Sequence, residues 1–366
     1  MGCPAHRLVR AIAILALLLV GYLALWPVPI RPYAWTPGPD PGQTGPYVPN
    51  DDLGRAHLIP VGVGADDVAP ETIARGPHDG RLYTALANGW IVRLPEGAGT
   101  TERVVSVGPR PLGIVFGADG TLFVAHTRRG ILAVAPDLSV RTVTNCVDGP
   151  YPEFTDSLYR AADGTIWFTC PSRRFDLEHV RLDGMETRPT GRVMRYDPRT
   201  GRTSTEHDDI MFANGITMGP AEDFVLVNEW ARYRVTRVWV AGPRAGEREV
   251  FIDDLPGYPD NIHRDADGLY WVGLVIQRNA LLDRLHPHPF LVKILPRIPA
   301  ALQPFPPRFG WLLALDGDAR VVHNLQDSTG VMDQVTGALR VRDRLYVSSN
   351  TMSAVATLPV PPRVAP

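Results

Sequence analysis

The sequence predicts an all-β fold, a six-bladed β-propeller preceded by a single N-terminal transmembrane helix. Three observations support this fold class. A unit of short strands joined by polar turns recurs six times after about residue 58. The chain contains 34 Gly and 36 Pro, which indicates many turns rather than long helices. The third observation is an uncharged run near the N-terminus, from Ala11 to Ile30.

Residues 11–30 are predicted to form a transmembrane signal anchor. At ~1.5 Å per residue, the stretch from Ala11 to Trp26 is long enough to cross a ~30 Å hydrocarbon core. Arg7 and Arg10 precede it, so the positive-inside rule places residues 1–10 in the cytoplasm and the rest on the extracytoplasmic side. The alternative is a cleaved signal peptide, but the sequence has no A-x-A pattern at the end of the run.

Residues 31–57 are predicted to be a Pro-rich stalk. Eight prolines occur between Pro27 and Pro49, a density that disfavours helices and strand ladders and favours extended polyproline geometry.

The propeller is predicted over residues 58–366. Its repeated units begin near Glu71, Gly113, Ser157, Gly215, Asn261 and Gly337, and several carry Asp-Gly turns between apolar strands. The segment before the first unit should close the ring against the final LYVSS and AVATL strands. Residues 277–311 interrupt the fifth unit with leucines and isoleucines at helical spacing, so a helical insert is expected there. We expect it to pack on the propeller and cover the channel rather than to contact the membrane.

Composition limits the partners and the disulfides. The net charge of −2 and the lack of a long basic run make nucleic acid an unlikely partner, so none is predicted. Only three Cys occur, which excludes a disulfide-dense scaffold. Cys146 and Cys170 form either one disulfide or two separate thiols. The oligomeric state cannot be read from the chain.

The residues just before the first strand of each unit are candidates for an axial site. In a propeller the innermost strand of each blade starts near the central channel, so these residues should converge on the axis. The positions are Glu71, Pro111-Leu112, Thr155-Asp156, Asn214, Asp260-Asn261 and Thr336. Asn214 and Asn261 lie beside apolar strands, where a buried carboxamide needs partners.

Four blocks of the sequence resemble the strictosidine synthase-like family, which includes the adipocyte plasma membrane-associated proteins and lies within the wider group of calcium-dependent phosphotriesterases. They are GRVMRYDPRTGRT from Gly191, FANGI from Phe212, ARYRVTRVWVAGPRAG from Ala231 and EVFIDDLPGYPDNIHR from Glu249. The resemblance, which runs from about Pro60 to Pro359, implies a six-bladed propeller with a signal anchor. It also implies an axial calcium ion held by Glu71, Asn214, Asp260 and Asn261.

The chain departs from the family pattern at two positions. Thr155 replaces an Asn that precedes Asp156, and a hydroxyl is a poorer calcium ligand than an amide oxygen. Leu112 stands where paraoxonases carry a catalytic His, so that mechanism cannot be transferred.

These residues suggest hydrolysis of a small carboxylic ester or lactone. Ca²⁺ suits the oxygen ligands, and Asp156 is the candidate base that takes a proton from water. No G-x-S-x-G motif supports a serine nucleophile. His126 is expected to be structural, and Glu229 with Arg232 to form a turn-stabilising pair. A metal-free condensation or lyase reaction of the strictosidine synthase type and a non-catalytic ligand-binding propeller are the alternatives.

Overall fold

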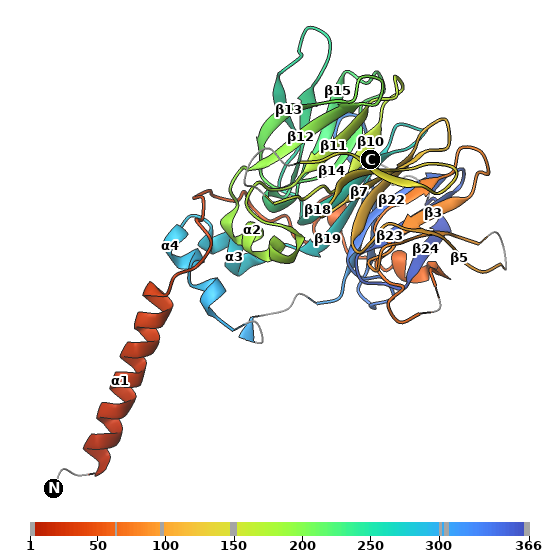
Figure 1. Cartoon of the computed structure of the whole chain (residues 1–366). Helices are drawn as coiled ribbons and strands as arrows, with labels where there is room; N and C mark the ends of the chain where they lie inside the picture. The colour runs from red at the N-terminus through yellow and green to blue at the C-terminus, as the bar shows by residue number, and fades with distance from the viewer. Residues whose placement is uncertain are drawn as a thin grey trace.

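The computed structural model describes residues 4–62, 64–95, 99–146, 152–299, 302–303 and 307–361. Over these residues the chain forms six four-stranded antiparallel sheets, arranged as the blades of a propeller with one helix projecting from it (Figure 1). The predicted six-bladed fold is confirmed.

Blades 1 to 5 each use four strands that are consecutive in the sequence. Blade 1 is β2 (Ile73–Arg75), β3 (Leu82–Ala85), β4 (Trp90–Arg93) and β5 (Glu102–Ser106); blade 2 is β6 (Pro111–Phe116), β7 (Leu122–His126), β8 (Gly130–Val134) and β9 (Val140–Thr144). Blade 3 is β10 (Leu158–Arg160), β11 (Ile166–Cys170), β12 (Gly191–Asp197) and β13 (Arg202–Ile210); blade 4 is β14 (Ala213–Met218), β15 (Phe224–Glu229), β16 (Arg234–Trp239) and β17 (Arg248–Ile252). Blade 5 is β18 (Gly257–Arg264), β19 (Tyr270–Gln277), β20 (Gly310–Leu315) and β21 (Val321–Asp327).

Blade 6 joins the two ends of the propeller. It contains β22 (Val335–Val341), β23 (Arg344–Ser349) and β24 (Ala354–Pro359), and its outer strand is β1 (His57–Pro60). β1 pairs antiparallel with β24, with His57 opposite Thr357 and Pro60 opposite Ala354. The predicted ring closure by the segment before the first repeat is confirmed.

The Asp-Gly turns act as the sequence suggested. Gly120 and Gly164 adopt positive φ angles of 87° and 89°, which cost a glycine little. The preceding Asp119 and Asp163 each accept a hydrogen bond from the backbone N–H two residues later, at 3.1 and 2.9 Å.

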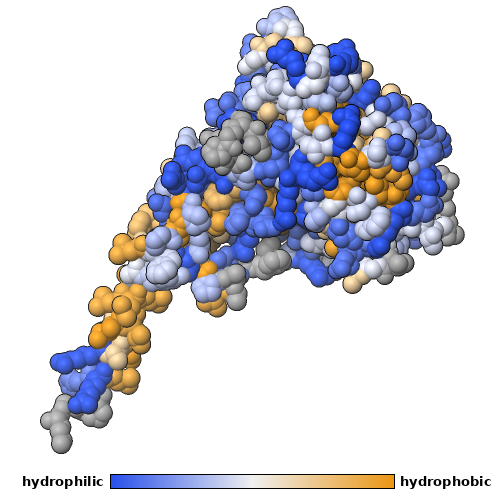
Figure 2. Space-filling view, viewed as in Figure 1, coloured by the Kyte–Doolittle hydropathy of each residue, from blue (hydrophilic) through white to orange (hydrophobic). Residues whose placement is uncertain are grey.

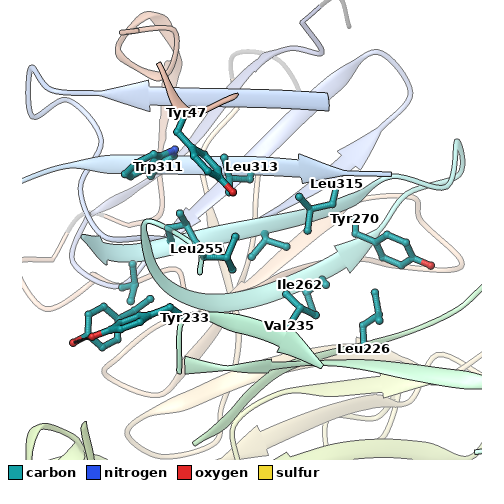
Figure 3. Packing of buried hydrophobic residues seen from close by; sticks show 14 of the residues in the cluster. Tyr47, Leu226, Tyr233, Val235, Leu255, Ile262, Tyr270, Trp311, Leu313 and Leu315 are labelled. Carbon is teal, nitrogen blue, oxygen red and sulfur yellow. Dashed lines mark hydrogen bonds between the residues drawn. The ribbon is translucent and has the colours of Figure 1, made fainter. Parts of the chain in front are cut away.

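Apolar side chains fill the space between neighbouring blades. In the largest cluster, side chains from blade 4 meet those of blade 5 (Figure 3). Tyr47, which precedes the propeller, packs edge-to-face on Trp311, with 6.2 Å between the ring centroids.

The N-terminal helix α1 (Pro4–Leu25) contains one candidate membrane span, His6–Leu25. The helix ends at Leu25 rather than at Ile30, because the prolines at 27 and 29 cannot continue it. Val28 and Ile30 instead pack against the propeller, beside Phe175 and Val292.

The segment predicted as a stalk does not stand free of the propeller. The backbone N–H of Tyr33 donates to the carbonyl of Glu186, and Gln326 donates to the carbonyl of Tyr47. Two short 3-10 helices, η1 (Gly45–Tyr47) and η2 (Leu53–Arg55), bury Tyr47 and Leu53. The proline content indicated extended geometry, but it could not indicate that the chain has a surface to lie on.

Helical segments gather on the side of the propeller near α1 (Figure 1). Between β11 and β12 lie η3 (Leu177–His179) and α2 (Val180–Glu186). Residues 277–311 contain α3 (Ala280–Leu285), α4 (Pro289–Val292) and η5 (Leu295–Arg297), so the insert is a series of short helices between β19 and β20.

Glycines and β-bulges shape the channel end of the inner strands. The pairing register shifts in β6, β14, β18 and β22 near the predicted axial positions, and a bulge re-aims the side chains at its site. Leu112, Asn214 and Thr336 are each followed by a glycine whose missing side chain leaves room for the adjacent blade. At Gly215 a Cβ would lie 2.5 Å from the carbonyl oxygen of Asp260.

We therefore expect Gly215→Ala to destabilise the propeller. The new methyl group would meet the backbone of blade 5, which cannot rotate away, and overpacking of this kind costs about 1–3 kcal/mol. Thermal unfolding of the variant should show a lower midpoint than wild type. Gly317→Ala is the matched control, because its new methyl group would have no atom within 4 Å; equal midpoints for the two variants would contradict this account.

Candidate active site on the propeller axis

Side chains from four blades meet at one end of the channel. Glu71, Asp156, Asn214 and Asp260 line a single cavity of about 280 Å³, and all four are buried. Asn261 is also buried and donates a hydrogen bond to the Glu71 carboxylate at 2.9 Å. The structure therefore brings together all five side chains that the sequence singled out, although their roles as ligands and base remain predictions.

Hydrogen bonds between blades hold these residues. Thr336 of blade 6 donates its hydroxyl to the Glu71 carbonyl at 2.7 Å. The backbone N–H of Gly113 in blade 2 donates to the carbonyl of Asp156 in blade 3. Asn228 of β15 donates to the carbonyl of Asp260 at 2.5 Å. The site thus depends on the closed ring rather than on one strand.

The three carboxylates perturb one another. Burial raises the pKa of Glu71, and burial together with the nearby Glu71 charge raises the pKa of Asp156 well above its ordinary value. The pKa of Asp260 is raised by burial and by both other carboxylates. Strongly perturbed acids that line a cavity are typical of functional sites.

A positive charge that the sequence did not reveal faces this cluster. Arg110 lines the same cavity and donates to Asn350 Oδ1 at 3.2 Å. Its positive charge offsets part of the rise in the pKa of each of the three carboxylates. Its φ of 64° is unusual for a residue with a side chain. Hydrogen bonds involving Ala87 and Thr127 hold that backbone in place.

The donor set fits a hard cation. Three buried oxygens in the cluster have no hydrogen-bond partner: Asp156 Oδ1, Asn214 Oδ1 and Asn261 Oδ1. An unpaired buried oxygen is costly, and a calcium ion accepts carboxylate and amide oxygens as ligands. Within the described ranges, no group of three or more His, Cys, Asp or Glu side chains forms a metal site by itself. A cation here would therefore depend on the amide oxygens.

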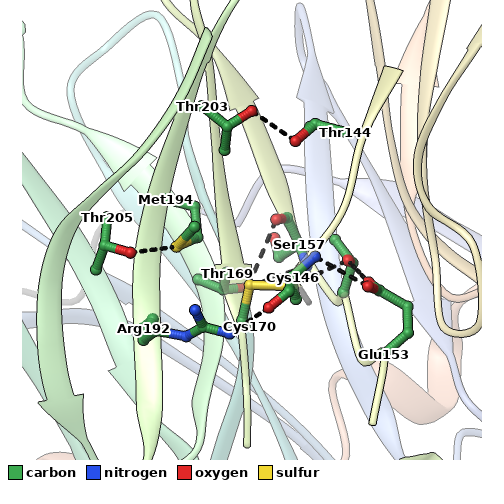
Figure 4. Close-up of a disulfide and its surroundings, with 11 residues drawn as sticks. Thr144, Cys146, Glu153, Ser157, Thr169, Cys170, Arg192, Met194, Thr203 and Thr205 are labelled. Atoms are coloured by element: carbon green, nitrogen blue, oxygen red, sulfur yellow. Dashed lines mark hydrogen bonds between the residues drawn. A yellow bond between two sulfur atoms is a disulfide. The ribbon is translucent and has the colours of Figure 1, made fainter. Parts of the chain in front are cut away.

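Thr155 does not take the place of the missing amide ligand. Its hydroxyl donates to Glu153 Oε1 at 2.5 Å and lies 3.2 Å from Cys146 Sγ. Cys146 forms a disulfide with Cys170, which decides between the two alternatives for these cysteines (Figure 4). The disulfide links the start of the segment leading to Asp156 to the end of β11.

One wall of the cavity is apolar. Leu112 packs with Phe154 and Phe212, and Trp230 lies against Phe212 with 4.9 Å between the ring centroids. Leu112, which stands where paraoxonases carry a His, is therefore part of an apolar wall. His126 is buried outside this cavity, where its Nδ1 accepts from the backbone N–H of Arg128.

The expected pair of Glu229 with Arg232 is wrong. Glu229 is buried and binds Arg234 through two nitrogens, at 2.8 and 2.5 Å, and it accepts a hydrogen bond from Thr236. Arg232, in η4 (Trp230–Arg232), stacks over the Trp35 ring instead. Glu229 and Arg234 face each other across β15 and β16, which one-dimensional spacing did not indicate.

Comparison with known proteins identifies the relatives of the chain. A family model described as strictosidine synthase matches residues 157–243, and one described as strictosidine synthase-like, N-terminal, matches residues 45–94. Protein STRICTOSIDINE SYNTHASE-LIKE 7 of Arabidopsis thaliana is 34% identical over 68% of this chain and 67% of its own length. The adipocyte plasma membrane-associated protein of Bos taurus is 32% identical over 92% of this chain and 86% of its own length.

Solved structures share the fold at lower identity. A gluconolactonase from Xanthomonas campestris superimposes with a TM-score of 0.58 and 16% identity, covering 85% of this chain and 91% of its own. A calcium-binding protein, regucalcin, from Agrobacterium tumefaciens gives a TM-score of 0.57 and 14% identity, covering 83% and 93%. Because relatives above 30% identity align over most of its length, the chain belongs to the strictosidine synthase-like family.

Proposed function

We propose that this protein hydrolyses small carboxylic esters or lactones in the axial cavity. The observation that carries the proposal is the meeting of three buried carboxylates, Asn214 and Arg110 on one cavity with an apolar wall, where Asp156 Oδ1 and Asn214 Oδ1 have no hydrogen-bond partner. An ester or lactone needs such a combination, because its carbonyl requires charge stabilisation while the remainder of the molecule is apolar. The gluconolactonase fold is compatible with this chemistry.

Each axial residue has a proposed role. Glu71, Asn214, Asp260 and Asn261 would hold Ca²⁺, which, when bound, polarises a substrate carbonyl. Asp156 takes a proton from the attacking water. One of its carboxylate oxygens, Oδ1, has no hydrogen-bond partner and is free to accept that proton.

Substitution of the axial residues separates binding from chemistry. Asn214→Ala should lower turnover of aryl esters or lactones by ~100-fold or more, about 3 kcal/mol, because one oxygen ligand is lost. Asp156→Asn should retain calcium but lose turnover. The measurements are steady-state rates on aryl esters and on five- and six-membered lactones, with calcium content by elemental analysis.

Asn88→Ala and Asp119→Asn are the matched controls, because neither residue lines the axial cavity. Full activity of Asn214→Ala would refute the assigned site. If the calcium-saturated wild-type protein left every ester and lactone intact, the hydrolase proposal would fail and a ligand-binding propeller would replace it.

Arg110 provides a test that needs no substrate. Its positive charge opposes that of a cation on the same cavity, so Arg110→Gln should tighten calcium binding by about tenfold, or ~1.4 kcal/mol. Calorimetric titration with Ca²⁺ measures this change. Arg320→Gln, an exposed arginine elsewhere, should have no effect. Weaker binding by Arg110→Gln would mean that Arg110 orders the ligands instead of opposing the ion.

We also propose that α1 is an uncleaved anchor with its N-terminus in the cytoplasm and the propeller on the extracytoplasmic side. Arg7 and Arg10 precede the span, and the Cys146–Cys170 disulfide suits an oxidising compartment. One relative is named as plasma membrane-associated. The proposed partners are the membrane and a small ester or lactone, with no nucleic acid.

Thiol accessibility tests this topology. In intact cells, Cys3 should react with a permeant maleimide but not with an impermeant one, whereas the buried, disulfide-bonded Cys146 and Cys170 should react only after denaturation and reduction. Peptide mass spectrometry locates the label. Free thiols at positions 146 and 170, or a mature N-terminus beyond Trp26, would contradict the proposal.

A further inference from the structure

A second cavity lies beside the axial one. It measures about 410 Å³ and is lined by α2, the insert, Trp230 and residues of blade 5. Its apolar lining includes Met185, Leu281, Leu282, Leu295, Ile298 and Leu302. Arg181, Trp230 and Ile276 line both cavities, so these three residues form a shared wall. The volume falls within the ~300–1,000 Å³ of small-molecule sites.

The insert that forms this cavity is attached to the end of α1. Arg297 of η5 donates to the carbonyls of Leu23 and Trp26, each at 2.7 Å, and its own carbonyl accepts from Tyr22. These donors satisfy carbonyls that a helix end leaves unpaired, and a cation there complements the helix dipole. The insert therefore sits where the candidate membrane span ends.

No free spacer separates α1 from this region. Ile30 is buried between Phe175 and Val292, together with Leu182 of α2 and Leu285 of α3. The chain thus passes from the end of the span directly into the contact between α2 and the insert.

Part of the rim of the second cavity is apolar and exposed, and the exposed polar residues Arg181 and Asn279 also line the cavity. Leu281 and Leu302 line the cavity and are 54% and 75% exposed, and Phe290 on α4 is 60% exposed. In the space-filling view, hydrophobic surface continues from α1 onto the helical segments beside it (Figure 2). Exposed apolar residues next to a membrane span are suited to contact lipid.

We propose that this cavity binds the hydrocarbon tail of a single-chain amphiphile that enters from the membrane. The tail occupies the space between α2 and the insert, and the polar end reaches the axial cavity past the wall at Trp230. This inference rests on the proposed function for the identity of the polar end, which would be an ester or lactone carbonyl. The substrates would then be esters or lactones of fatty acids.

The test uses a palmitic acid that carries a diazirine at the end of its chain. The full-length protein in phosphatidylcholine nanodiscs is irradiated with this probe, and labelled peptides are quantified by mass spectrometry. α1 serves as the internal reference, because it contacts lipid in every sample. We expect the peptides that line the cavity, which contain Met185 and Leu282, to be labelled in addition to α1.

Leu282→Trp should fill the cavity and lower the ratio of cavity label to α1 label by at least tenfold. Leu138→Trp is the matched control, since Leu138 is an exposed leucine on the turn between β8 and β9. Leu302→Glu at the exposed rim should lower the ratio at least threefold without affecting the core. Label confined to α1 in the wild type, or an unchanged ratio in both cavity variants, would overturn the proposal.

Hydrolysis of nitrophenyl esters separates this inference from the proposed function. Each added methylene buried in the cavity should favour the longer ester by about fourfold, and Leu282→Trp should abolish that preference. Cavity labelling without hydrolysis would refute the hydrolase and leave the tail site intact. Hydrolysis without chain-length preference or cavity labelling would refute the tail site alone.

Discussion

The pairing of β1 with β24 is the contact on which the rest of the molecule depends. It joins the two ends of the propeller in one sheet, and the inner strand of that sheet, β22, carries Thr336. Thr336 holds the backbone of Glu71 in blade 1, and Glu71 in turn binds Asn261 of blade 5. The axial site is assembled across the closure, so an open ring would separate its carboxylates.

Closure also creates the electrostatic problem that defines the site. Glu71, Asp156 and Asp260 are buried near one another, and Arg110 offsets only part of their charge. A buried charge without a partner is costly, so a polar cluster of this kind lowers stability unless something neutralises it. The glycines after Leu112 and Asn214 let the blades approach closely enough for the cluster to form. The axis thus gathers buried charge at a cost to the stability of the fold.

The sequence predicted the structural features that recur in every blade and missed those that occur only once. Blade number and the axial set Glu71, Asp156, Asn214, Asp260 and Asn261 followed from one periodic unit, because each inner strand reaches the channel at an equivalent position. Arg110 has no such equivalent. It points into the cavity because its backbone adopts a left-handed conformation, which its sequence context between two prolines does not reveal. The packed course of residues 31–57 and the Glu229–Arg234 pair depend on tertiary neighbours. Composition and spacing contain no information about them.

The attachment of α1 fixes the orientation of the axial site relative to the candidate membrane span. A helix joined to a propeller by a flexible tether would let the cavity face any way, whereas Arg297 and Ile30 attach the end of α1 to the insert at the channel end. The second cavity, which α2 and the insert line, is therefore held close to the end of the candidate span. An apolar substrate dissolved in lipid would concentrate at that level and would not need to cross water to reach Trp230. In the proposed arrangement the anchor would contribute to substrate selection as well as to location.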